Sequence, residues 1–182
     1  MIKTTSVIVC EYIWIGGNGD LRSKTKVLHN FDYSYPEWNF DGSSTEQAPS
    51  DGNTEVILKP CSIFIDPCRF IDKYRRVLVL CDTYDNDGQP LPTNHRNSAV
   101  KIFDKIEYDV NCWFGLEQEY YLMNPSTNYP MGFNPYENQR QGQYYCSVGA
   151  ENAFGREIAE RHMNYCIEAG IKISGMNAEV GI

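Results

Sequence analysis

The chain has 182 residues, with 16 Lys and Arg against 24 Asp and Glu, and its formal net charge is −8 at pH 7. This acidic balance disfavours tight nucleic-acid binding, which depends on basic side chains that neutralise phosphates, and it permits acidic sites for metal cations. Hydrophobic residues make up 42% and charged residues 22%, which is typical of a globular protein and not of a disordered chain. The longest apolar run, residues 77–81, is far shorter than the ~20 residues of a membrane-spanning helix.

Cysteine usage indicates a reducing compartment. The 7 cysteines are an odd number and contain no C-x-x-C pair. We therefore expect free thiols in a cytoplasmic protein, most of them serving as small buried hydrophobic residues. The apolar stretch that precedes Glu11 is too short for a signal peptide.

The first part of the chain is predicted to open with a β-hairpin. Val, Ile, Tyr and Trp are concentrated in residues 6–15, which predicts a strand. A glycine-rich turn and a partner strand at residues 22–28 follow, as in a hairpin. Residues 33–54 are rich in Pro, Gly and Ser and predict a long loop, which Trp38 and Phe40 indicate is ordered.

Three further strands are predicted before the middle of the chain. Two short strands are expected on either side of Pro60, at residues 55–59 and 62–65. Residues 76–83 contain a continuous apolar run, which predicts a strand buried on both faces. The turn-forming residues 85–90 mark the predicted domain boundary.

The second part of the chain alternates between helix and strand. Asn94 is expected to cap a helix that runs to about residue 108, and a strand is expected over residues 113–123. After a loop, Asn152 is expected to cap a helix that ends before Gly170. A final strand is predicted over residues 171–180, and this strand–helix–strand order is typical of parallel strands.

Acidic residues supply the sharpest candidate site. Glu117 and Glu119 are two residues apart, so on a strand they would share a face with their α-carbons ~6.6 Å apart. Apolar neighbours make burial of this pair costly unless it is paired or metal-bound, and hard oxygen ligands suit Mg²⁺ or Mn²⁺. A solvent-facing strand is the alternative interpretation. Glu179 is a third acid near a strand end, with a surface glutamate as its alternative.

A second candidate lies in the turn over residues 39–45, where Asp41 is followed by glycine and three hydroxyl residues. The turn either presents an acid and hydroxyls to a ligand or is held by hydrogen bonds of its own Asp and Ser side chains. The sequence contains no phosphate-binding loop, serine-hydrolase elbow or zinc-protease motif.

Taken together, these stretches resemble eukaryotic-type glutamine synthetase. The matching segments occur in order and at family spacing over nearly the whole chain. They are EYIWI (11–15), WNFDGSST (38–45), PC (60–61), DPCR (66–69), LCD (80–82), PTNHR (92–96), WFGLEQEY (113–120), YYCSVGA (144–150), GRE (155–157) and ISGMNAEV (173–180). The resemblance implies a ligase that makes glutamine from glutamate, ammonia and ATP through γ-glutamyl phosphate, with divalent cations that neutralise the phosphates.

The resemblance also implies a fold and an assembly. We expect an α+β fold, with an N-terminal β-grasp domain over residues 1–88 and the first part of a glutamine-synthetase-type α/β catalytic barrel over residues 89–182. The expected cofactors are ATP and Mg²⁺ or Mn²⁺. The expected partners are glutamate, ammonia and further copies of the chain in a homo-oligomer with active sites between subunits, without nucleic acid or membrane.

Residue roles in the catalytic domain are carried over from the resemblance by position. Glu117 corresponds to the ligand of the cation on the ATP phosphate side, and Trp113 and Glu117 border the nucleotide. Glu119 and Glu179 correspond to ligands of the cation on the glutamate side, and Glu119 counts as a catalytic residue. These three acids are expected to converge on one face of one sheet, with the Glu119 and Glu179 carboxylates within about 10 Å of each other.

In the β-grasp domain, Asp41 corresponds to a catalytic acid that helps ammonium bind and lose a proton, acting from the neighbouring subunit. Ser44 in the same loop is a weaker candidate for a role in the site. Because Asp41 acts across a subunit contact in the family, we expect it to lie far from Glu119 within one chain.

The resemblance stops after Val180, before the family's metal-binding His and its phosphate-binding Arg residues. We therefore expect the chain to be the N-terminal half of the enzyme, to bind Mg²⁺ or Mn²⁺ weakly at best and to make no glutamine alone. A non-catalytic paralogue that acts as a subunit partner or regulator is the alternative. A glycosidase pair formed by Glu117 and Glu119 is disfavoured, because such carboxylates, ~5–5.5 Å apart in retaining enzymes, face each other across a cleft.

Overall fold

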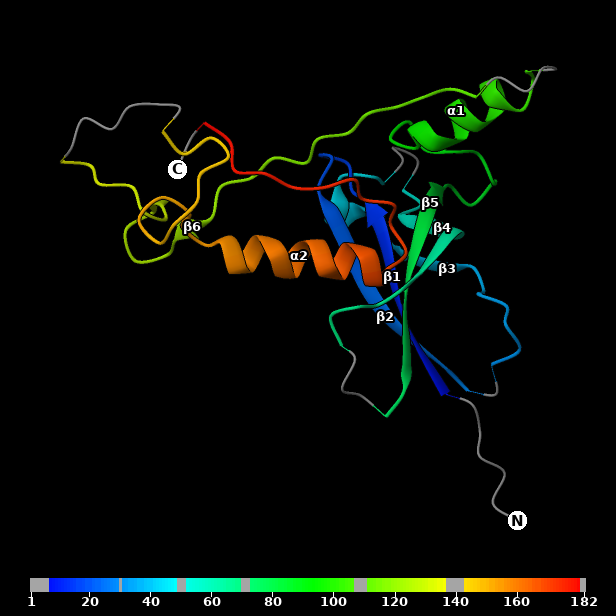
Figure 1. Ribbon diagram of the computed structural model, residues 1–182. Coiled ribbons are helices and arrows are strands. Elements are labelled where there is room, and N and C mark those ends of the chain that lie inside the picture. The colour runs from blue at the N-terminus through cyan, green and yellow to red at the C-terminus, as the bar shows by residue number, and fades with distance from the viewer. Residues whose placement is uncertain are drawn as a thin grey trace, which may run out of the picture. The chain divides into compact units, whose positions relative to one another are not determined.

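Five strands from the first part of the chain form one mixed sheet in the order β2-β1-β5-β4-β3 (Figure 1). β1 and β5 are parallel, and the other neighbouring pairs are antiparallel. The strand bounds are Val7–Ile15 for β1, Leu21–His29 for β2, Trp38–Asp41 for β3, Glu55–Ile65 for β4 and Arg75–Tyr84 for β5. A mixed sheet with few helices is consistent with the predicted β-grasp-like domain.

This computed structural model describes residues 7–29, 31–48, 52–69, 73–106, 111–136 and 143–180. The chain divides into two compact units, Met1–Asn111 and Cys112–Ile182. All seven cysteines are free thiols, as the sequence predicted. The prediction that most of them are buried is wrong, because only Cys10 and Cys81 are buried and four are exposed. Among the described residues, no helix is both long and apolar enough to cross a lipid bilayer.

The predicted hairpin is confirmed. β1 pairs with β2 in a continuous antiparallel register from Val7 opposite His29 to Ile15 opposite Leu21. The glycine-rich turn is closed by the Gly16 N–H, which donates to the Asp20 carbonyl at 2.8 Å. Gly19 has a φ of 79°, a left-handed conformation that favours glycine at this position of the turn.

One face of the sheet carries the core of the first unit. The buried side chains alternate along β1 and β5, and they are Ile8, Cys10, Tyr12, Trp14, Val77, Val79 and Cys81. The Trp14 ring stacks on Phe40 with centroids 4.5 Å apart, and Tyr12 meets Trp38 edge-on at 5.4 Å. The prediction that β5 is buried on both faces is wrong, because the residues between its core positions are only half-buried.

Two predicted boundaries change for physical reasons. The predicted loop over residues 33–54 contains β3 and a single 3₁₀ turn, η1 (Gly42–Thr45). The two short strands expected around Pro60 are one strand, β4, whose register with β5 shifts between Pro60 and Ser62. Proline has no N–H to donate to a ladder, so a bulge accommodates it and the strand continues.

Helix α1 (His95–Phe103) is capped by Asn94 as predicted, since the Asn94 side chain accepts from the Asn97 N–H. The helix ends at Phe103, before the expected residue 108, which lies outside the described residues. Asn94 also donates to the Thr83 carbonyl at 3.0 Å, which fastens the start of α1 to β5. The compact units divide after Asn111, and the domain boundary predicted at residue 88, which lies in a turn inside the first unit, stays a prediction.

The second unit contains helix α2 (Arg156–Glu168) and a minimal hairpin of β6 (Met123–Asn124) and β7 (Tyr129–Pro130). The N-cap of α2 is Gly155, with a φ of 68°, so the prediction that Asn152 caps this helix is wrong. Gly170, with a φ of 86°, follows the helix as predicted.

Both strands predicted for the second unit, over residues 113–123 and 171–180, are irregular apart from Met123, the first residue of β6. Strand geometry requires a neighbouring strand to accept and donate backbone hydrogen bonds, and β6 with β7 is the one strand pair of this unit in the described ranges. The predicted strand–helix–strand unit is therefore not formed in this structure.

Candidate functional site

The turn that carries Asp41 is ordered by hydrogen bonds within the turn. Asp41 ends β3 and caps η1, and its Oδ1 accepts from the Ser43 N–H at 3.0 Å and from the Ser43 hydroxyl at 2.7 Å. These bonds lower the pKa of Asp41 below its ordinary value of 3.8, and the Thr54 hydroxyl adds to the effect. Asp41 and Ser44 are exposed. The turn therefore presents an ionised, oriented carboxylate to solvent.

The backbone of this turn is fastened on two sides. The Gly42 N–H donates to the Thr54 carbonyl at 2.6 Å, and the Gly17 N–H in the β1–β2 turn donates to the Thr45 carbonyl at 2.9 Å. Gly42 is buried so closely that an added Cβ would lie 2.7 Å from Val56 Cγ2. A side chain at residue 42 would therefore push the turn away from β4.

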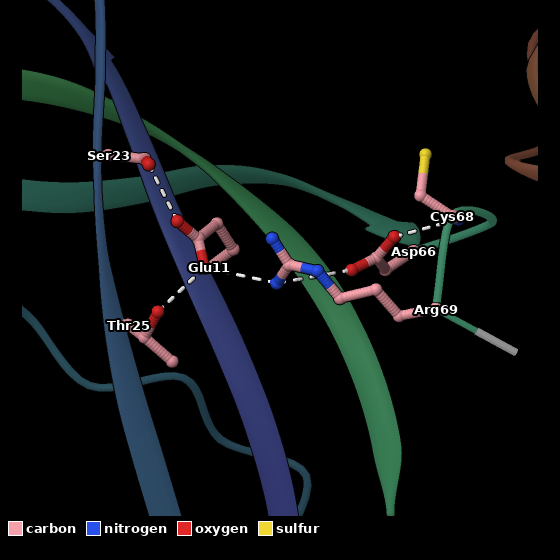
Figure 2. A network of polar contacts seen from close by, with 6 residues as sticks. All are labelled: Glu11, Ser23, Thr25, Asp66, Cys68 and Arg69. Carbon is pink, nitrogen blue, oxygen red and sulfur yellow. Dashed lines mark hydrogen bonds and ion pairs between the residues drawn. The ribbon is translucent and has the colours of Figure 1, made fainter. Parts of the chain in front are cut away.

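A partly exposed network of polar contacts, on the sheet face opposite the core, connects two segments that the sequence singled out (Figure 2). Glu11 on β1 accepts from the Ser23 hydroxyl at 2.6 Å and from the Thr25 hydroxyl at 2.7 Å, both on β2. Arg69 lies between two acids, with its Nη1 3.5 Å from Glu11 Oε2 and 3.7 Å from Asp66 Oδ2. The network fastens the turn after β4 to the first two strands.

The balance of effects on Glu11 favours its charged form. Burial by itself would raise the pKa of Glu11, but the hydroxyls of Ser23 and Thr25 and the charge of Arg69 outweigh it, so the pKa lies below its ordinary value of 4.5. Each oxygen of this carboxylate accepts from at least one protein donor. We therefore assign it a structural role and not a binding role.

In the second unit, three of the sequence-predicted site residues lie on the irregular segment before β6. Trp113 is 90% exposed, and Glu117 and Glu119 are exposed beside it. The far end of the segment is held within the unit, because the Tyr120 hydroxyl lies 3.0 Å from His162 Nδ1 on α2. The acids themselves are held by no strand pairing.

Glu179 lies on the second irregular segment of the same unit. Its Oε1 accepts from the Asn177 side chain at 2.8 Å, and the adjacent Ala178 carbonyl accepts from the Cys146 N–H at 2.9 Å. The pKa of Tyr145 is raised by the charge of Cys146 first, then by Glu179, with a smaller contribution from Glu117. Glu117 and Glu179 thus both raise the pKa of the same tyrosine.

Within the ranges that the structure describes, no three His, Cys, Asp or Glu side chains gather closely enough to hold a metal ion together. The donor chemistry of Glu117, Glu119 and Glu179 suits Mg²⁺ or Mn²⁺. Their positions do not form a ready metal site. Their convergence stays a prediction, as does the separation of Asp41 from Glu119, because these two residues belong to different units.

Sequence reasoning missed several residues that shape these sites, namely Gln47, Thr93, Tyr145 and the Tyr120–His162 pair. Each acts through a partner that is distant in sequence, such as the 42 positions between Tyr120 and His162. A periodicity argument uses only neighbouring residues and cannot find such pairs.

Curated proteins align with nearly the whole chain, although no family model matches the sequence. A putative glutamine synthetase of Acanthamoeba polyphaga mimivirus is 50% identical over 184 residues, which cover 98% of this chain and 50% of that protein. Glutamine synthetase root isozyme 4 of Zea mays is 50% identical over 188 residues, covering 97% of this chain and 50% of that protein. By sequence, this chain is similar to glutamine synthetases.

A third relative, glutamine synthetase cytosolic isozyme 2 of Vitis vinifera, is 48% identical over 183 residues. That alignment covers 97% of this chain and 50% of the Vitis vinifera protein. The chain spans about half the length of the curated relatives it matches. The glutamine synthetase resemblance is thus confirmed, and it extends over half of the family's length.

Proposed function

We propose that this chain acts in glutamine synthesis, as the β-grasp domain and the first part of the catalytic barrel of an ATP-dependent glutamate–ammonia ligase. The observation that carries the proposal is about 50% identity to proteins named glutamine synthetase over 97–98% of the chain. The five-stranded mixed sheet of the first unit supports the β-grasp part. A cytoplasmic location is proposed with it, since the Vitis vinifera relative is named a cytosolic isozyme.

Three carboxylates are the proposed metal ligands. Glu117 is proposed for the cation on the ATP side, and Glu119 and Glu179 for the cation on the glutamate side. A bound Mg²⁺ or Mn²⁺ would neutralise phosphate charge during phosphoryl transfer. The exposure of these acids leaves them free to take ligands, and Trp113 at 90% exposed offers a flat apolar surface to a nucleotide base.

Asp41 is the proposed ammonium-side acid, contributed to the site of a neighbouring subunit in a homo-oligomer. Ser43 keeps the carboxylate ionised and fixes its orientation. An ionised, oriented and exposed carboxylate attracts a small cation such as ammonium and can accept one of its protons. Ser44, exposed in the same turn, is a weaker candidate for the same task.

The experiment is to express the longest open reading frame that contains this sequence and to measure glutamine formed from glutamate, ammonia, ATP and Mg²⁺. Glu119→Gln should lower the rate at least about 100-fold, since loss even of a group that supports a metal ligand costs up to that factor. The matched control is Glu151→Gln, an exposed acid of the same unit, which should leave the rate unchanged. An inactive product, or full activity of Glu119→Gln, would overturn the proposal.

The alternative function is that of a non-catalytic subunit partner that keeps the β-grasp surface, which the five-stranded sheet of the first unit would supply. Mixing the purified chain with an active glutamine synthetase distinguishes the two. Co-elution with a change in the enzyme's rate supports the partner role, and separate elution excludes it.

A further inference from the structure

Gln47 follows η1 and is 6% exposed, and its side chain joins three segments of the first unit. The Gln47 Nε2 donates to the Ile15 carbonyl at 3.1 Å, at the end of β1. The same Nε2 donates to the Thr93 hydroxyl at 3.1 Å, just before α1. A single buried amide therefore fastens the end of the Asp41 turn to two elements that are distant in sequence.

The backbone around Gln47 reinforces this attachment. The Gln47 N–H donates to the Gly42 carbonyl at 2.9 Å, which closes the turn on itself. Gly17 lies so close that an added Cβ would be 2.6 Å from the Thr45 carbonyl oxygen. Thr45 is itself 6% exposed. The turn thus has one buried side, which faces the sheet, and one exposed side, which carries Asp41.

The two ends of the turn are held in different ways. Asp41 at its start pairs with Glu55 in the β3–β4 ladder. Gln47 at its end has no strand partner and is held by its side-chain amide bonds to Ile15 and Thr93, together with the backbone bond from Gly17 to Thr45. Release of the side-chain bonds would leave this end with backbone bonds alone, and the turn between the two ends carries Ser43, which bonds the Asp41 carboxylate.

We propose that Gln47 is a positioning residue for Asp41, acting through the η1 turn. This inference rests on the proposed function, in which Asp41 handles ammonium. Ammonium offers few contacts, so the angle of the carboxylate must be set by the protein, and misplacement by about 1 Å is costly in such sites. Gln47 supplies that constraint from the buried side of the turn.

The two side-chain hydrogen bonds of Gln47 determine which substitutions remove its attachment to Ile15 and Thr93. Both bonds of the side chain are donated by Nε2, while the Gln47 Oε1 is buried without a partner in the structure. Gln47→Glu keeps the shape but replaces the donor with an oxygen that faces the Ile15 carbonyl. Gln47→Met removes both bonds without adding a charge. Thr93→Val removes one acceptor, and Thr93→Ser restores it.

The test follows the Asp41 carboxyl carbon by NMR during a pH titration of the 182-residue chain. Asp41 should titrate below 3.8 in the wild type. Its pKa should rise towards 3.8 in Gln47→Met and Gln47→Glu, rise partly in Thr93→Val and return in Thr93→Ser. Amide exchange in β1 and β5 should stay slow throughout. The control Gln89→Met, at an exposed glutamine in another turn, should leave the pKa of Asp41 unchanged.

An unchanged Asp41 titration in folded Gln47→Met overturns the inference. If Gln47→Met does not fold, identical titrations of Thr93→Val and Thr93→Ser overturn it instead. A separate assay on the active ligase keeps the proposed function distinguishable. There, Gln47→Met should raise the KM for ammonium several-fold and leave the KM for ATP unchanged. A shifted titration with an unchanged ammonium KM would support the positioning by Gln47 and refute the role of Asp41.

Discussion

Glu11 and Asp41 are both ionised carboxylates with lowered pKa values, but they are built for different tasks. Glu11 is half-buried, and two hydroxyls and an arginine contact its two oxygens (Figure 2). Asp41 is exposed, with hydrogen bonds from Ser43 and from the Thr54 hydroxyl. The Glu11 carboxylate joins two strands and a turn, whereas the Asp41 carboxylate faces solvent, where it can take a ligand.

The Glu11 network predicts how stability depends on pH. Because the folded pKa of Glu11 is below 4.5, its stabilisation is present above that value and is lost as pH falls through the folded pKa. Glu11→Gln should lower the free energy of unfolding by about 1–3 kcal/mol at pH 7, since hydrogen bonds to a charged group are weakened. The difference between wild type and variant should shrink below pH 4.5.

Chemical denaturation at pH 7 and at pH 3 measures this effect. The control is Glu37→Gln. The exposed carboxylate of Glu37 lies 3.9 Å from Lys59, and its loss should change the free energy of unfolding little. If Glu11→Gln lowers the free energy of unfolding equally at both pH values, the structural role assigned to ionised Glu11 is contradicted.

At the residue scale, the sequence predicted what depends on local bonds and missed what depends on distant ones. The Asp41–Ser43 bond spans two residues, so the turn chemistry could be read from the local pattern. Gln47 reaches Ile15 and Thr93, which are 32 and 46 positions away, so no local pattern indicates its role.

At the element scale, Asn94 both starts α1 and joins it to the sheet. Its Oδ1 accepts from the Asn97 N–H, and its Nδ2 donates to the Thr83 carbonyl on β5, with the residue 7% exposed. The sequence predicted the cap because capping is local. It could not predict the bond to β5, which depends on how the chain folds back.

Replacing Asn94 separates these two tasks. Asn94→Ala should cost about 2 kcal/mol of unfolding free energy, from a lost cap and a lost buried hydrogen bond at about 1 kcal/mol each. Asn94→Asp keeps the cap but loses the donor, and should also destabilise the protein. Thermal and urea unfolding measure both variants. The control Asn86→Ala, in an exposed turn, should stay within ±0.5 kcal/mol, and equal stability of Asn94→Asp and wild type would contradict this account.

The two predicted strands of the second unit show what periodicity leaves out. Alternation along residues 113–123 specifies which side chains share a face, but a strand also needs a partner for its backbone. The exposed aromatic and aliphatic residues of this segment, such as Trp113, Phe114 and Leu116, are those of a sheet face that lacks its neighbours.

Hydrogen exchange on the 182-residue chain tests whether these two segments lack strand pairing. Amides of residues 113–122 and 171–179 should exchange within the dead time or nearly so, because their N–H groups are not in ladders. Amides at the centre of β1 and β5 should be among the slowest. Slow exchange over residues 113–122 would show that these residues form a strand in solution after all.

At the scale of the whole molecule, the two units differ in how many hydrophobic side chains they bury. In the described part of the second unit, Tyr144 is the one buried hydrophobic residue, whereas the first unit buries a continuous cluster along its sheet. The sequence predicted the sheet well because its strands find their partners within one unit.

The activity of the chain alone follows from the same division. Without a three-carboxylate cluster in the described residues, and with half the length of its relatives, the 182-residue chain should bind Mg²⁺ or Mn²⁺ weakly and make no glutamine. Titration with Mn²⁺ and an assay with glutamate, ammonia, ATP and Mg²⁺ measure both. Turnover by this chain that disappears in Glu119→Ala would show that half the family's length is enough for catalysis.

The parallel pairing of β1 with β5 also determines when the sheet can form during synthesis. These strands are neighbours in space, from Ile8 opposite Arg75 to Ile13 opposite Leu80, yet β2, β3 and β4 lie between them in sequence. The β1–β2 hairpin leaves the ribosome first, but the buried cluster that joins Ile8 and Tyr12 to Val77 and Val79 can be completed only after β5 has emerged. The sheet therefore forms through a contact between strands that are distant in sequence, and β1 waits for β5 during synthesis.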